Sequence, residues 1–73
     1  MENPFFSVRF RGYDRSQVDR AVARIRKAME VGTPPHPDSL TNLGFQMTMR
    51  GYDVREVDDY FDDIARSLRH GSG

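Results

Sequence analysis

The chain has 73 residues, with 11 basic and 11 acidic side chains, 2 His, no Cys and a hydrophobic fraction of 37%. This length and balance fit one small domain, and they exclude a second domain, thiol chemistry and a general electrostatic attraction for nucleic acid. No apolar run could span a membrane and the amino end lacks a secretory pattern, so the sequence predicts a cytoplasmic chain. Because domains this short usually need a disulfide, a metal or a partner subunit, we expect self-association, most simply as a homodimer.

The sequence contains an internal repeat. Arg-Gly-Tyr-Asp occupies positions 11–14 and again 50–53, and a Val-Asp pair follows each copy at the same distance, which gives an offset of 39 residues. This pattern predicts a tandem duplication within a single domain spanning residues 1–73. The predicted repeats are residues 5–31 and 40–70, and a Pro-rich connector, residues 32–39, joins them.

Each repeat begins with alternating apolar residues, which predict a short strand with one buried face. The alternative is an extended loop whose aromatic side chains dock onto helices. The alternating residues are Phe6, Val8 and Phe10 in the first repeat and Phe45, Met47 and Met49 in the second.

Gly12 and Gly51 predict a turn after each strand, and a helix start follows each turn. Asp14 has Gln17 three residues later, and Asp53 has Glu56, which is the spacing of a capping box. The Tyr before each Asp and the Val four residues after it have the spacing of a hydrophobic staple. We therefore expect the motif to be architectural rather than catalytic. The capping-motif residues are Gly12, Tyr13, Asp14, Gly51, Tyr52 and Asp53.

Apolar residues then recur at helical spacing in both repeats, which predicts two amphipathic helices of about 16 residues. The first should end near residues 31–32 and the second near residues 70–71. The predicted helix-pairing interface comprises Val18, Val22, Ile25, Met29, Val57, Phe61, Ile64 and Leu68.

Charge is divided unequally between the halves. Residues 1–37 hold seven basic and four acidic groups, net +3, and residues 38–73 hold four basic and seven acidic groups, net −3. This complementarity indicates that the helices pair, within one chain or between chains, with charge setting their orientation. The residues assigned to this pairing are Arg20, Arg24, Lys27, Asp59, Asp62 and Asp63.

The predicted fold class is α+β and mostly helical, in the order β-α-β-α, with a pseudo-twofold two-stranded ribbon packed on two helices. The alternative is an all-α helical hairpin with extended N-terminal arms. The direction of strand pairing is open, and so is exchange of the halves between chains.

The residues support no catalytic or metal-binding arrangement. His36 lies in the connector and His70 near the end, and neither has a second ligand at metal spacing. The acidic residues of the second helix lack the glycine-bearing loop of a calcium site. We expect no enzymatic activity, cofactor, metal, nucleic-acid partner or small-molecule substrate.

The doubled Arg-Gly-Tyr-Asp motif, the Val-Asp that follows and the amphipathic helix resemble the amino-terminal domain of DivIVA, and the duplication is similar to DivIVA-domain repeat proteins of actinobacteria. The resemblance implies a non-enzymatic domain that binds membranes at poles and septa, which in DivIVA itself precedes a long coiled coil. It assigns membrane contact to Phe10, Arg11, Met49 and Arg50, with Met49 departing from the family's aromatic residue. For Phe10, the strand pattern leaves a core role open as well.

The leading functional prediction is a protein-interaction and self-association module, with a docking or targeting role in bacterial cell division or polar envelope growth. Its partner would be a second copy or another division protein. One alternative is a peripheral membrane binder that uses Phe10 and Arg11 on an anionic surface at the inner face of the cell membrane. The other is a segment of a larger adaptor protein, indicated by the abrupt end at residues 70–73.

Overall fold

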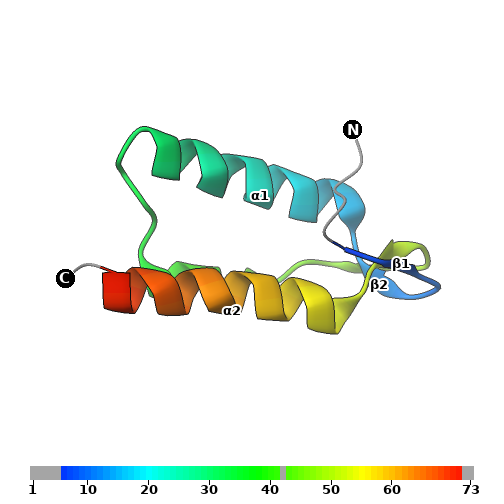
Figure 1. The fold of residues 1–73 in the computed structure, drawn as a ribbon. Helices are drawn as coiled ribbons and strands as arrows, with labels where there is room; N and C mark the ends of the chain where they lie inside the picture. The colour runs from blue at the N-terminus through cyan, green and yellow to red at the C-terminus, as the bar shows by residue number, and fades with distance from the viewer. Residues whose placement is uncertain (1–5, 42, 72–73) are drawn as a thin grey trace.

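The computed structural model describes residues 6–41 and 43–71, which form a small α+β fold with a four-stranded antiparallel sheet and two α-helices (Figure 1). The all-α alternative is therefore wrong. Residue 5, with which the predicted first repeat begins, and residues 72–73 lie outside the described part. The elements in chain order are β1 (Val8–Arg9), β2 (Gly12–Tyr13), α1 (Arg15–Glu30), the 3-10 helix η1 (Pro37–Leu40), β3 (Met47–Thr48), β4 (Gly51–Tyr52) and α2 (Val54–Gly71).

Both helices begin and end close to the predicted positions. Asp14 precedes α1, and its Oδ1 accepts a hydrogen bond from the Gln17 backbone N–H at 3.1 Å. Asp53 precedes α2 and accepts from the Glu56 backbone N–H at 3.0 Å. These carboxylates satisfy amide groups that the first helical turn leaves without a partner. Each helix starts directly after a strand, so α1 and α2 run side by side in the same direction, away from the sheet (Figure 1).

The predicted two-stranded ribbon is corrected to a sheet of four very short strands. The chain bends at residues 10–11 and turns at residues 49–50, so each alternating segment ends in a loop, and each Gly-Tyr that follows forms a strand of its own. The strand order is β1-β4-β2-β3, with every pair antiparallel. The two strands from one half are therefore never neighbours, and the loops of the two halves interleave.

The alternating residues do not form one buried face. Phe6 is buried and Phe45 is partly buried. The four that follow them, Val8, Phe10, Met47 and Met49, are all exposed. The prediction fails because alternation sorts side chains onto two faces only while the strand continues, and here the strands last two residues.

The connector contains a structural element that its composition did not indicate. Pro37–Leu40 forms η1, and the Nδ1 of His36 accepts a hydrogen bond from the Asp38 N–H at its start. Leu40 is buried beside α2, and Arg69 of α2 donates to Asp38 at 2.9 Å. The connector is thereby fixed along α2 for part of its length.

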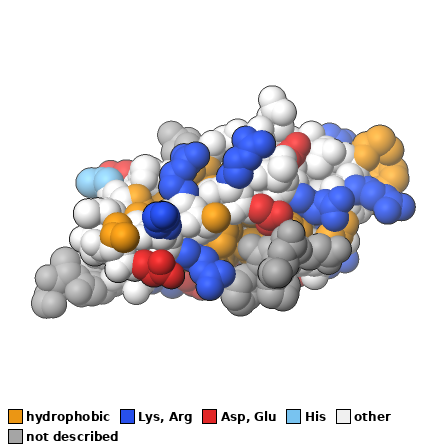
Figure 2. Space-filling view, turned by 90° about the horizontal axis from the view of Figure 1, so that it is seen from above, with side chains coloured by type: hydrophobic (Ala, Val, Ile, Leu, Met, Phe, Trp, Pro, Cys, Tyr) orange, Lys and Arg blue, Asp and Glu red, His pale blue; other side chains and the backbone are white. Residues whose placement is uncertain are grey.

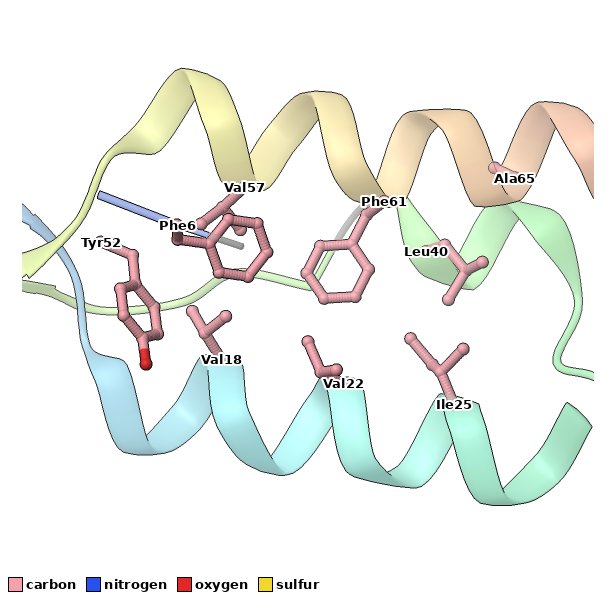
Figure 3. Close-up of a cluster of buried hydrophobic side chains, with 9 residues drawn as sticks. All are labelled: Phe6, Val18, Val22, Ile25, Leu40, Tyr52, Val57, Phe61 and Ala65. Atoms are coloured by element: carbon pink, nitrogen blue, oxygen red, sulfur yellow. The ribbon is translucent and has the colours of Figure 1, made fainter. Parts of the chain in front are cut away.

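The core lies between the two helices (Figure 3). Val18, Val22 and Ile25 of α1 face α2, and Phe6 and Leu40 fill the space between the helices. Of the predicted interface, Ile64 and Leu68 are partly buried. Met29 is 42% exposed, so it is not part of the buried core; it lies near the end of α1 and lines a groove with Ile25, Tyr60 and Ile64. The buried residues are Phe6, Val18, Val22, Ile25, Leu40, Tyr52, Val57, Phe61 and Ala65.

Candidate functional site: the crossed tips

Two glycines allow the backbones of the two halves to cross. A Cβ atom on Gly12 would lie 2.1 Å from the Tyr52 carbonyl oxygen, and one on Gly51 would lie 2.3 Å from the Tyr13 carbonyl oxygen. Side-chain carbons cannot approach backbone atoms so closely, so only glycine fits at these positions. Their role is close approach rather than the turn predicted for them.

Side chains at the helix starts bind the backbone just before a strand of the opposite half. The Ser7 backbone N–H donates to Glu56 Oε1 at 2.7 Å, and the Gln46 backbone N–H donates to Gln17 Oε1 at 2.8 Å. The predicted capping box is therefore only half formed. Gln17 and Glu56 bond to the other half, while the Asp14 N–H donates to the Gln46 carbonyl and the Asp53 N–H to the Ser7 carbonyl, both at 2.8 Å.

The two motif tyrosines connect each loop to the helix of the other half. Tyr13 Oη donates to Asp58 at 3.0 Å, and Tyr52 Oη donates to Asp19 at 2.8 Å. Partial burial, with the hydrogen bond to Asp58 as the next cause, raises the pKa of the Tyr13 hydroxyl. The two aspartates belong to the repeated Val-Asp pair, so the repeat marked them although their partners could not be identified from spacing.

The interleaved loops bring the four residues named by the family resemblance to one end of the molecule. Phe10 and Arg11 join β1 to β2, and Met49 and Arg50 join β3 to β4; we call these four the crossed tips. Phe10 is 74% exposed and Met49 is 64% exposed, which rules out the core role that the sequence left open for Phe10. Both arginines are also exposed. Figure 2 shows hydrophobic side chains at one end of the molecule beside basic ones.

The crossed tips are electropositive. The segments 8–13 and 47–52 contain three arginines and no acidic residue. Both helices also begin at this end, and the positive end of a helix dipole lies at its start. Arg9 contacts Asp53 at 2.8 Å, so its charge is partly balanced, whereas Arg11 and Arg50 are exposed residues of the loops.

The N-cap carboxylates are stabilised in their charged forms. The Ser16 hydroxyl, followed by the Gln17 backbone N–H, lowers the pKa of Asp14. The Glu56 backbone N–H, followed by the Arg9 guanidinium, lowers the pKa of Asp53. These contacts assign Asp14 and Asp53 to helix capping and to the rigidity of the loops that carry the tips.

The predicted charge pairing between the helices is not formed within the chain. Among the described residues, Asp62 and Asp63 pair with Arg66 of their own helix, and no ion pair joins them to the basic residues of α1. Those basic residues, Arg20, Arg24 and Lys27, are exposed. In the same described ranges, no three His, Cys, Asp or Glu side chains gather closely enough to hold a metal ion.

No protein-family model, curated protein or solved structure matches the chain. Neither α1 nor the described part of α2 is sufficiently long and apolar to cross a bilayer.

Proposed function

We propose that this chain is a non-enzymatic module that docks onto anionic membrane surfaces through its crossed tips. The observation that carries the proposal is the pair of exposed apolar side chains, Phe10 and Met49, beside Arg9, Arg11 and Arg50. Apolar side chains surrounded by arginines suit the boundary between headgroups and acyl chains, where the rings enter the apolar layer and the guanidinium groups meet lipid phosphates. The resemblance to DivIVA domains adds a targeting role in cell division or polar growth.

Each contact between the halves occurs twice, which supports a duplicated architecture for this module. The Tyr–Asp contacts, the Ser7–Glu56 and Gln46–Gln17 contacts and the strand registers each come as two members whose residues differ by 39. We interpret the chain as two tandem repeats related by a pseudo-twofold axis near the pairing of Tyr13 with Tyr52. In this arrangement each repeat supplies one tip, and the two tips can meet one surface together.

The expected affinity of a single copy is modest. Inserting the Phe10 side chain contributes about 2 kcal/mol and Met49 about 1.5 kcal/mol, and each arginine near an anionic surface adds about 1 kcal/mol. Before any cost of immobilising the protein, these terms correspond to a dissociation constant of roughly 20 μM, and that cost, about 4 kcal/mol or more, weakens it into the millimolar range or beyond. Stable residence on a membrane therefore requires several copies.

The direct test is cosedimentation with vesicles of phosphatidylglycerol and phosphatidylcholine, compared with phosphatidylcholine alone. The wild-type chain should bind the anionic vesicles. Phe10→Ala with Met49→Ala should weaken binding at least about tenfold, and Arg11→Ala with Arg50→Ala should remove the preference for anionic lipid.

The matched control is Met29→Ala, which truncates another exposed apolar side chain far from the tips. Circular dichroism should show unchanged helix content in every variant, because the substituted side chains lie outside the core. Absence of vesicle binding by the wild type, or equal binding by the Phe10 and Met49 double variant, would overturn the proposal.

A second candidate role is self-association. The observation that favours it is the unequal distribution of charge, since α1 presents a basic face and α2 an acidic one without ion pairs between them in the described residues.

A further inference from the structure

A half-open groove runs beside α2, on the side covered by the segment after η1. It has a volume of about 480 Å³. Its apolar floor includes Leu43, which is exposed, and Phe45, whose ring lies 5.7 Å from that of Phe61. Three carboxylates of α2 form one wall: Asp58, Asp59 and Asp62. We call this feature the acidic groove.

The outer face of α1 has the opposite charge. Arg20, Arg24 and Lys27 each follow a buried residue of α1 by two positions, which is about 200° around a helix. They therefore lie on the face opposite the core. Figure 2 looks onto this side of the molecule and shows basic side chains along it. We call these three residues the basic face.

One chain cannot bring the basic face and the acidic groove together. Val18, Val22 and Ile25 face α2 across the core, which turns the basic face of α1 away from α2. Reversing that orientation would expose the core. The two complementary surfaces can therefore meet only between molecules.

We infer that the acidic groove is the docking site for the basic face of α1 of a second copy of this chain. Arg20 and Arg24 are four residues apart, as are Asp58 and Asp62, so the charges of both surfaces repeat every turn, at about 6 Å. The methylene stems of Arg24 and Lys27 can cover the apolar floor while their charged ends reach the carboxylates.

The contact is heterologous, because each copy uses two different surfaces. An open assembly therefore retains one free groove at one end and one free basic face at the other, unless a ring closes. The mass of the assembly should therefore rise with concentration and fall as salt screens the facing charges.

The test is sedimentation equilibrium of the full chain without lipid, at low and high NaCl. Wild-type protein should associate at low salt and dissociate at high salt. Arg20→Glu with Arg24→Glu should be monomeric, and so should Asp59→Arg with Asp62→Arg. An equimolar mixture of these two double variants should associate again, because each supplies the intact surface that the other has lost. Asp58 is left intact because Tyr13 bonds to it.

The matched control is Arg15→Glu with Arg26→Glu, which makes the same charge change on α1 but away from the basic face. It should associate like the wild type. A monomeric wild-type chain at low salt, unchanged association in either double variant, or failure of the mixture to associate would overturn the inference. Binding of an arginine-rich peptide by a chain that does not self-associate would also overturn it, since the occupant would then be a basic partner. All of these measurements are made without lipid, so failure of this inference is distinguishable from failure of membrane binding through the crossed tips.

Discussion

At the scale of single residues, Gly12 and Gly51 decide whether the two halves can interleave. The sequence marks both glycines by repetition, but the close approach that explains them involves backbone atoms about 40 positions away. Local turn rules therefore indicated the correct residues for an incorrect reason.

We predict that Gly12→Ala destabilises the fold by about 3 kcal/mol, because the added methyl group would overlap the Tyr52 carbonyl. This is a large fraction of the stability of a small domain. Gly32→Ala is the control: nothing lies within 4 Å of its Cβ position, and its positive φ of 81° should cost only about 1 kcal/mol. Urea unfolding measures both values. Similar losses in the two variants would show that the crossing does not require glycine.

The N-cap carboxylates make stability depend on pH. The pKa values of Asp14 and Asp53 are lowered in the folded chain, so their stabilising contribution is present above the unfolded pKa, about 4, and is lost as pH falls through the lowered folded values. We predict that the loss of stability on acidification is smaller in the double variant Asp14→Asn with Asp53→Asn. Asparagine still caps a helix but carries no titrating carboxyl group.

The measurement is a series of urea midpoints below pH 5. Asp59→Asn, on an exposed carboxylate of α2, serves as the control and should retain the wild-type slope. A double variant with the wild-type slope would contradict the assignment.

At the scale of elements, side chains in the first turn of each helix hydrogen-bond to the backbone of the other half. The sequence predicted the Asp caps correctly because a cap depends on residues within one turn. It wrongly predicted that Gln17 and Glu56 complete the box, since these side chains accept hydrogen bonds from the amides just before β3 and β1, which only the tertiary fold brings near.

We predict that Glu56→Ala loosens the segment before β1 without unfolding α2. The Ser7 amide should exchange with solvent roughly fivefold faster, which corresponds to about 1 kcal/mol for a lost hydrogen bond. Hydrogen exchange by NMR measures this, with amides of the buried part of α2 as an internal reference. Glu56→Gln keeps the accepting oxygen and should stay close to the wild type. Unchanged protection of Ser7 in Glu56→Ala would show that the contact contributes nothing.

At the scale of the whole molecule, the surfaces for the two proposed roles are separate. The molecule is elongated, with principal extents of 40 × 21 × 18 Å, and the crossed tips occupy the end at which both helices begin (Figure 1). The basic face and the acidic groove lie on the body of the molecule. Self-association through the body would therefore leave the tips available and multiply them.

We predict that Asp59→Arg with Asp62→Arg lowers binding to phosphatidylglycerol vesicles at least about tenfold at concentrations where the wild type associates. The change adds positive charge, so simple electrostatic attraction would raise binding instead. Vesicle cosedimentation over a dilution series separates these effects, because the difference should vanish where the wild type is monomeric. Stronger binding by the variant at every concentration would exclude a role for avidity.

The sequence by itself determined both helices, their Asp caps and the correspondence between positions 39 residues apart. The helices and caps depend on neighbours within about four positions, and the correspondence depends on repetition. Both can be read from a single sequence. Only the tertiary structure decided that the strands are two residues long and interleaved, that Phe10 and Met49 are exposed, and that Met29 lies outside the core. The physical reason is that these outcomes depend on which backbones cross, and that crossing is set by contacts between residues that lie far apart along the chain.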